Sequence, residues 1–191
     1  TSTTHVLQKI LSKLEESYHT FLTPTGFGAV FLAIFSTTRP GDEIIVADPV
    51  YSPTRILSQD FLKEFNIKTT FYNPHDLKTL ENSITKKTKL IFVENPGSNT
   101  FEFHDIGNVL SIAKKYKILT AMDNTWATPY FLKPIKLGFD MSIVSATKYY
   151  SGHSDVMGGS LAVNKKVFKK VAKTEKITGL RLGPDDAYLI T

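Results

Sequence analysis

The sequence predicts an α/β fold, a mostly parallel, doubly wound sheet with helices on both faces. Short apolar runs with many β-branched residues alternate with longer stretches whose apolar residues recur at helical spacing. The alternation has no repeat period, and no linker or low-complexity tract interrupts it. This pattern is typical of strands joined by crossover helices. We therefore expect residues 1–191 to form one domain.

The expected elements follow one another in a regular order. Residues 4–17 form the first helix, because Leu7, Ile10, Leu11 and Leu14 fall on one helix face. Apolar runs bounded by glycine, proline or polar residues predict strands that begin at Phe21 and then occupy residues 43–47, 67–72, 90–93, 119–122, 141–144 and 160–163. The remaining helices are expected at residues 29–35, 76–84, 106–116, 165–177 and 184–190, with one more that ends near residue 65 and a connector at 132–138.

The composition is that of an ordinary globular protein. Hydrophobic residues make up 41% of the chain and charged residues 21%. No apolar run approaches the roughly 20 residues that a membrane span needs. The net charge of +5 comes without a basic stripe interleaved with stacking aromatics. The absence of cysteine excludes disulfides and thiolate metal sites. We expect a cytoplasmic protein that binds neither membrane nor nucleic acid.

A glycine turn precedes the helix at residues 29–35. Thr25, Gly26, Phe27 and Gly28 follow the first short strand. Free N–H groups at a helix start bind anions, and Gly26 lets the backbone approach a phosphate closely. A glycine turn that only reverses the chain fits the same residues, so this pattern alone is weak.

Polar or aromatic residues follow two further strands. Tyr51 comes after the strand at 43–47, where its ring could cover a flat ligand or pack half-buried. A polar rim at residues 94–100, which begins with Glu94, follows the strand at 90–93. A Pro-Gly turn explains the proline and glycine of this rim without any ligand.

A lysine follows the strand that ends at residue 144. Ser145 and Thr147 lie within three residues of Lys148, at the sheet edge where α/β proteins bind ligands. Hydroxyls beside an ammonium suit a phosphorylated ligand, and a partly desolvated lysine can form a Schiff base. This combination suits pyridoxal phosphate (PLP), an aldehyde that carries a phosphate. Asp123, at the end of the preceding strand, can pair with the pyridine nitrogen of PLP, although a turn or N-cap role also fits it.

These motifs together resemble a known family. The sequence reads Asp-Asn-Thr-Trp at 123–126, Ser-Ala-Thr-Lys-Tyr at 145–149 and Gly-His-Ser-Asp at 152–155. Their order and separation are similar to those of the cysteine/methionine-metabolism (trans-sulfuration) group of fold-type I PLP enzymes. The Pro-Gly-Ser segment at 96–98 looks most like the bacterial cystathionine β-lyases. The resemblance covers nearly the whole chain and implies the large, PLP-binding domain of a transferase-like fold.

The resemblance also implies a role for each site residue. Lys148 attaches the cofactor and moves the Cα proton, while Tyr51 stacks on the cofactor ring and assists proton transfer. The other implied cofactor-binding residues are Gly26 and Phe27 through their N–H groups, Ser145 and Thr147 at the phosphate, Asp123 at the pyridine nitrogen, and Thr125 in the same motif. His104 and His153 are candidate acids or metal ligands, but turn or surface roles fit them better. Because no third ligand has a suitable spacing, we expect no metal site.

The resemblance implies a PLP-dependent carbon–sulfur lyase that converts L-cystathionine to homocysteine, pyruvate and ammonia. The same scaffold supports cystathionine γ-synthase, cystathionine γ-lyase or methionine γ-lyase chemistry, and a non-catalytic remnant that binds cofactor or a partner is a third interpretation. The substrate class is a small sulfur amino acid. Full-length relatives are expected to be homodimers or tetramers.

We expect the chain to be an incomplete large domain, truncated at both ends. In the resembled family, a Tyr-x-Arg segment that binds the neighbouring subunit's phosphate lies upstream of the first helix. A C-terminal small domain carries the arginine that binds the substrate carboxylate. Neither occurs in the sequence, and Arg55 and Arg181 are not in matching motifs. Loss of such a clamp weakens substrate binding and orientation, so an inactive truncated or split-gene product is one expected outcome.

Overall fold

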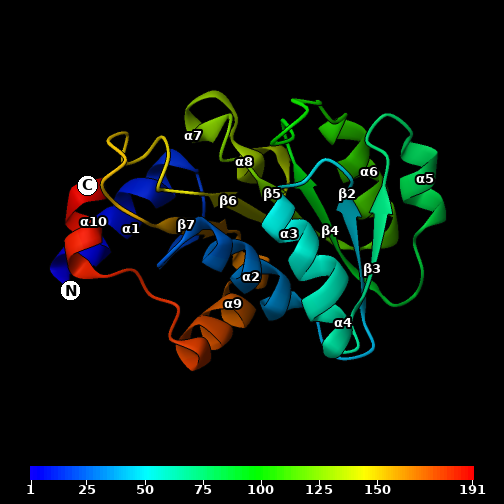
Figure 1. Ribbon diagram of the computed structural model, residues 1–191, viewed down its shortest axis with the longest axis horizontal. Helices are drawn as coiled ribbons and strands as arrows, with labels where there is room; N and C mark the ends of the chain where they lie inside the picture. The colour runs from blue at the N-terminus through cyan, green and yellow to red at the C-terminus, as the bar shows by residue number, and fades with distance from the viewer.

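A seven-stranded sheet forms the centre of the structure, a computed structural model that describes residues 1–191 (Figure 1). Its strands are β1 (His19–Thr23), β2 (Glu43–Ala47), β3 (Lys68–Tyr72), β4 (Thr88–Glu94), β5 (Leu119–Asp123), β6 (Met141–Val144) and β7 (Gly159–Val163). Their spatial order is β1-β7-β6-β5-β4-β2-β3. Neighbours pair in parallel except at β7, which is antiparallel to both β6 and β1. The expected mostly parallel α/β fold is confirmed.

Helices cover both faces of this sheet. They are α1 (Ser2–Leu14), α2 (Gly26–Thr37), α3 (Ser52–Ile56), α4 (Leu62–Glu64), α5 (Leu77–Asn82), α6 (Ile106–Tyr116), α7 (Thr128–Phe131), α8 (Pro134–Leu137), α9 (Lys165–Thr178) and α10 (Pro184–Ile190), and a π-helical turn, η1 (Leu57–Phe61), joins α3 to α4. In Figure 1, α2, α9, α3 and α4 lie in front of the sheet, and α6 lies behind it. The helices α1 and α10 pack together at one end, beside both termini. None of the helices combines the length and the apolar character that crossing a bilayer requires.

The main departure from the expected elements lies between β5 and β6. Residues 132–138 were expected to form a connector, but the segment holds α8, and α7 lies just before it. Each of these helices has four residues and a proline in its first turn. Such short helices bury too few residues for a helical period to appear in the sequence.

Two buried clusters hold the fold together. The central strand β4 is apolar and buried on both faces between Leu90 and Val93, as parallel strands covered by helices require. A smaller cluster joins α1, α10 and the loop after β6, and it includes Leu7, Ala146 and Val156. Because Ala146 and Val156 belong to that loop, the second cluster anchors the segment that carries Lys148.

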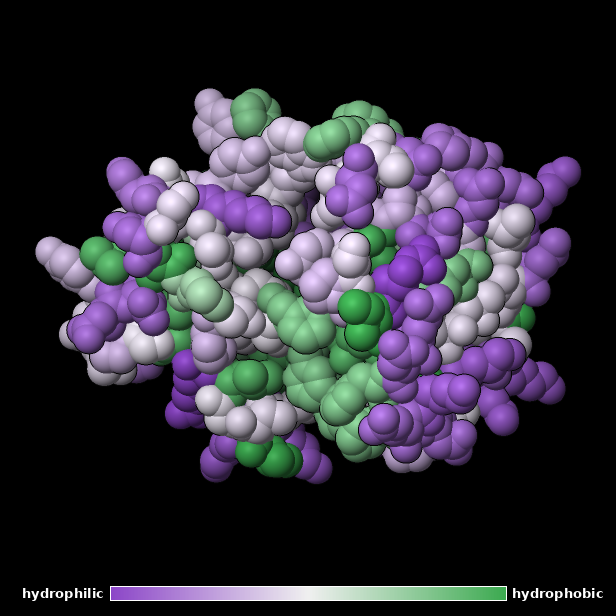
Figure 2. Space-filling model, in the orientation of Figure 1, coloured by the Kyte–Doolittle hydropathy of each residue, from purple (hydrophilic) through white to green (hydrophobic).

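Apolar side chains also gather on the outer face of α2, α3, η1 and α4 (Figure 2). Phe31, Phe35, Phe61 and Phe65 contact one another through their rings, and Ile56 is 59% exposed. We call these five residues the apolar face. A contiguous exposed patch of this kind is typical of a surface that contacts another chain or domain.

Candidate active site

A pocket of about 590 Å³ opens at the edge where the parallel strands end. The carboxyl ends of β1, β2, β4, β5 and β6 all reach this edge, because β7 alone runs in the opposite direction. The pocket is lined by all eight site residues expected from the sequence, namely Gly26, Phe27, Tyr51, Asp123, Thr125, Ser145, Thr147 and Lys148. Segments far apart in the sequence thus meet in one crevice, at the position that α/β sheets use for ligands. The roles assigned to these residues stay predictions.

The start of α2 supplies anion-binding groups to the pocket. Thr25 caps the helix, since its hydroxyl accepts the N–H of Gly28 at 2.9 Å. The N–H groups of Gly26 and Phe27 make no hydrogen bond within the chain. They are therefore free for an anion, which the positive end of the helix also favours. A Cβ on Gly26 would lie 2.5 Å from the Cβ and Oγ atoms of Ser145, so only glycine allows this close approach.

Hydrogen bonds fix the ends of β5 and β6 relative to each other. The Ser145 N–H donates to Thr125 Oγ1 at 2.8 Å, and the Thr125 N–H donates to Asp123 Oδ1 at 3.0 Å. Thr147 Oγ1 donates to the Gly158 carbonyl oxygen at 3.2 Å and accepts the Gly158 N–H at 3.0 Å. The Thr147 hydroxyl thus donates its proton within the loop that follows β6 and carries Lys148. Of the two hydroxyls expected at a phosphate, only that of Ser145 has its proton free of bonds within the chain.

Lys148 and Asp123 bring opposite charges to the same pocket. Burial raises the pKa of Asp123. Hydrogen bonds from Thr125 and, to a smaller extent, the positive charge of Lys148 oppose that rise. The Lys148 Nζ atom lies 5.6 Å from the centre of the Tyr51 ring, within the range at which an aromatic face attracts a cation. The pocket therefore holds an amine against an aromatic face, with a buried acid in its wall.

Several lining residues were not predicted as site residues. Glu94 ends β4 inside the pocket. Two signals in the sequence marked it, its position at a strand end and its match to the Glu-Ser-Pro segment that lies beside the cofactor in the resembled family. Trp126 stacks on Tyr149 with ring centres 6.0 Å apart, and Phe101 lies 5.7 Å from Trp126. We call these three rings the aromatic wall. Because the wall joins residues from three different loops, no local pattern could reveal it.

The two candidate histidines lie outside the pocket. His104, expected at a turn or on the surface, is buried, and its Nδ1 atom lies 3.3 Å from the hydroxyl of Tyr72 in the core. Burial lowers the pKa of His104 to about 4, so the ring is neutral at physiological pH. The Nδ1 atom of His153 lies 2.6 Å from the carbonyl oxygen of Ser151. Neither histidine belongs to a group of three metal-ligating side chains.

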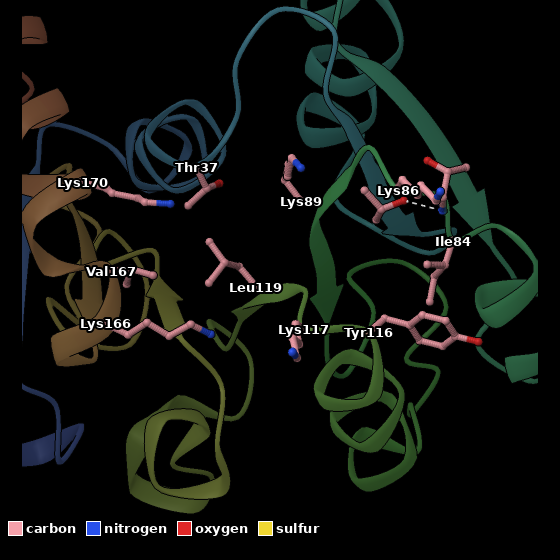
Figure 3. A pocket seen from close by; sticks show the side chains of 12 residues that line it. Thr37, Ile84, Lys86, Lys89, Tyr116, Lys117, Leu119, Lys166, Val167 and Lys170 are labelled. Atoms are coloured by element: carbon pink, nitrogen blue, oxygen red, sulfur yellow. Dashed lines mark hydrogen bonds between the residues drawn. The ribbon is translucent and has the colours of Figure 1, made fainter.

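A second hollow, of about 730 Å³, opens at the opposite edge of the sheet (Figure 3). The lysines that line it are Lys86, Lys89, Lys117, Lys166 and Lys170. The last residues of α2 and α6, Thr37 and Tyr116, line it too, and the negative end of a helix favours nearby cations. The negative ends of these two helices therefore favour the lysine charges that gather in this hollow. No carboxylate lines this hollow, so it offers no acid to a pyridine nitrogen.

The first pocket fits PLP. Free N–H groups and the Ser145 hydroxyl suit its phosphate, the buried carboxyl of Asp123 suits its pyridine nitrogen, and the Lys148 amine suits its aldehyde. The close approach of Gly26 to Ser145 leaves no room for a side chain at residue 26, so the Gly26 N–H lies near the Ser145 hydroxyl only because residue 26 is glycine. Fold and pocket together define a PLP-binding domain of the fold-type I class.

Known proteins of similar sequence and structure point to the same class. The family described as Cys/Met metabolism PLP-dependent enzyme matches residues 1–191, and the chain belongs to this family. The cystathionine beta-lyase MetC of Staphylococcus haemolyticus is 36% identical over 186 residues, which are 97% of this chain and 47% of that protein. The L-alanine/L-glutamate racemase of Wolbachia pipientis wMel is 33% identical over 189 residues, which are 99% of this chain and 46% of that protein. A crystal structure of cystathionine gamma-lyase from Lactobacillus plantarum, complexed with L-serine, has a TM-score of 0.94 at 32% identity and covers 98% of this chain and 49% of that one.

The family confirms PLP as the cofactor and places the chain in a PLP-dependent enzyme of cysteine and methionine metabolism. The chain spans about half the length of the curated relatives it matches, between 46% and 50% of each. Those relatives include β-lyases, γ-lyases and a racemase. Their names therefore leave open the reaction and the substrate of the protein to which this chain belongs.

Proposed function

We propose that the protein is a PLP-dependent carbon–sulfur lyase of the cystathionine β-lyase type, in which residues 1–191 supply the PLP-binding large domain. The reaction splits L-cystathionine with one water into homocysteine, pyruvate and ammonia. The observation that carries the proposal is the pocket in which Lys148, Asp123 and Tyr51 meet the free N–H groups of α2. Relatives named as cystathionine β-lyases support the choice of reaction.

In this proposal, residues of the pocket hold the cofactor at both of its ends. When bound, PLP supplies an aldehyde that condenses with an amine and a ring that draws electrons from the Cα atom of the substrate. Gly26, Phe27 and Ser145 hold the phosphate. Asp123 pairs with the pyridine nitrogen as a carboxylate, since a cationic partner reverses the rise in pKa that burial causes. The face of Tyr51 covers the ring.

Lys148 then handles the protons of the reaction. Its amine takes the proton from Cα, and the electron pair left on Cα breaks the bond between Cβ and sulfur. The departing sulfur takes a proton from Lys148 or from the hydroxyl of Tyr51, whose ring centre lies 5.6 Å from Lys148 Nζ. The aromatic wall offers a polarisable surface for the thioether, because sulfur packs favourably near aromatic rings.

The products formed by the protein that contains this chain distinguish the candidate reactions. We expect pyruvate and homocysteine to form from L-cystathionine in equal amounts, as measured by enzymatic detection of the 2-oxo acid and by thiol titration. Release of 2-oxobutyrate with cysteine instead would indicate γ-elimination. Formation of the D-amino acid from L-alanine or L-glutamate, without a 2-oxo acid, would indicate a racemase, and no turnover of any of these would indicate a non-catalytic protein.

We also propose, from the family resemblance, that the protein is a cytoplasmic homodimer or homotetramer. The apolar face supports a contact with another subunit or domain, because burying the exposed area of its rings in such a contact is favourable. Sedimentation of the protein that contains this chain would report the number of subunits.

A further inference from the structure

Glu94 is a buried acid that the proposed reaction does not use. It ends β4 in the wall of the pocket and is 6% exposed. Both of its carboxyl oxygens are engaged: Oε2 accepts the Tyr51 N–H at 2.7 Å, and Oε1 accepts the hydroxyl of Ser98. The carboxyl group thus joins the turn after β2 to the loop after β4.

The contact with Tyr51 matters because only one other backbone hydrogen bond holds that residue, in which the Tyr51 carbonyl oxygen accepts the Arg55 N–H at 3.1 Å. Tyr51 lies at the start of α3 without a side-chain cap, and its side chain belongs to no aromatic pair. The residue is 43% exposed, and its ring faces Lys148 across 5.6 Å. The hydrogen bond from its N–H to Glu94 therefore fixes the backbone from which the ring projects.

The charges around Glu94 come from two other strand ends. Asp123 at the end of β5 is the neighbouring acid, and Lys148 in the loop after β6 is the neighbouring base. Tyr51 and Ser98 face the carboxyl from the remaining sides. Burial, with a smaller contribution from Asp123, raises the pKa of Glu94 to about 7. The hydrogen bond to the Tyr51 N–H survives protonation, because a neutral carboxyl still has a carbonyl oxygen that accepts it.

We propose that Glu94 is a positioning residue, which clamps the Tyr51 backbone so that the Tyr51 ring stays over the cofactor beside Lys148. The inference rests on the proposed role of Tyr51 and adds that Glu94 holds Tyr51 in the position this role requires. Geometry rather than charge is the requirement. A glutamine at this position keeps a carbonyl oxygen at the same reach, whereas an aspartate keeps the charge but is one methylene shorter.

The chain provides a direct reporter of cofactor binding. Trp126 is the only tryptophan of residues 1–191 and lies in the pocket wall, so the fluorescence of this chain is expected to fall when PLP binds beside it. Titration with PLP gives a Kd for each variant without any measurement of turnover. Glu102→Gln is the matched control, because Glu102 lies in the same loop region but pairs with His75 outside the pocket. Its Kd is expected to equal that of the unchanged protein.

The expected order of affinities separates a clamp from a charge. Glu94→Gln should bind PLP within about threefold of the unchanged protein, while Glu94→Asp and Glu94→Ala should bind about tenfold more weakly. The reverse order, with aspartate tolerated and glutamine not, would show that charge is required and would overturn the proposal. Thermal unfolding without PLP shows whether each variant folds. If the alanine variant does not fold, Glu94→Asp alone provides the comparison with Glu94→Gln.

A double-mutant cycle tests whether Glu94 acts through Tyr51. In a Tyr51→Ala background the clamp has no ring to hold, so Glu94→Asp should change the Kd by less than about threefold. An undiminished tenfold loss in that background would mean that Glu94 acts by another route, and the inference would fail. Failure of this inference can be told apart from failure of the proposed function. A protein that forms no pyruvate but binds PLP still gives the four Kd values of the cycle.

Discussion

Replacing Lys148 by alanine is expected to reduce pyruvate formation from L-cystathionine by about a thousandfold, in the protein that contains this chain. A positioned acid–base group contributes roughly 10²- to 10⁴-fold to a rate, and no other amine lines the pocket to replace it. The groups proposed to hold the phosphate and the pyridine nitrogen are unchanged. We therefore expect the variant still to quench Trp126 fluorescence when PLP is added.

Two controls make the Lys148 prediction specific. Lys78→Ala removes an exposed lysine of α5 that lies outside the pocket, and its activity should equal that of the unchanged protein. A small added amine such as methylamine should restore part of the activity of Lys148→Ala, since it can enter the space left by the side chain and move the proton. Full activity in Lys148→Ala without added amine would show that another group performs the proton transfer.

The contribution of the buried acids to protein stability is expected to fall between pH 5 and pH 8, because their pKa values in the fold lie well above those in the unfolded chain, while neutral His104 contributes in the opposite direction. Glu15, at the end of α1, is fully buried; the Ser142 hydroxyl donates to its carboxyl at 3.2 Å, and the buried Tyr150 hydroxyl is its other polar neighbour. Burial raises the pKa of Glu15 to about 7. Between the ordinary value of 4.5 and this raised value, the folded chain holds a proton that the unfolded chain has lost. The stabilisation is thus complete below pH 4.5 and is lost as the pH rises through 7, at a cost of about 3 kcal/mol.

Urea unfolding of Glu15→Gln at pH 5 and pH 8 measures this contribution. Glutamine does not titrate, so the difference between the two pH values should shrink by about 2 to 3 kcal/mol relative to the unchanged protein. Part of the fall should remain, because Glu94 titrates in the same range. Glu64→Gln, an exposed position on α4, should leave the difference unchanged. If Glu15→Gln lost as much stability between pH 5 and pH 8 as the unchanged protein, the Glu15 carboxyl would not be the cause of the pH dependence.

The sequence predicted the strands well because each is a short apolar run that stops at polar or turn residues. Once the parallel order was expected, the meeting of Tyr51, Asp123 and Lys148 followed, since the carboxyl ends of such strands share one edge. The family motifs then supplied the roles that the residue types alone left open. Gly26 was found through the turn at the start of α2, and its close approach to Ser145 gives the physical reason for glycine there.

The features that escaped prediction all depend on contacts between distant segments. Glu94 bonds to the backbone of a residue 43 positions earlier, so its role has no local pattern. The burial of His104 depends on a tyrosine in β3, 32 positions away. Glu15 bonds to Ser142 across 127 positions, and that contact forms only when the end of α1 is brought to β6 by the folded chain. Local periodicity in a sequence predicts individual helices and strands. It does not predict which side chains of different helices, strands and loops come into contact.

The most direct test of the site is to find where PLP becomes covalently attached. The purified protein is incubated with PLP, reduced with borohydride and digested, and the labelled peptides are identified by mass spectrometry. We expect one labelled lysine, Lys148, with a stoichiometry near one and with an absorption band that changes on reduction. A label on other lysines, or no label at all, would contradict the assignment of this pocket as the cofactor site.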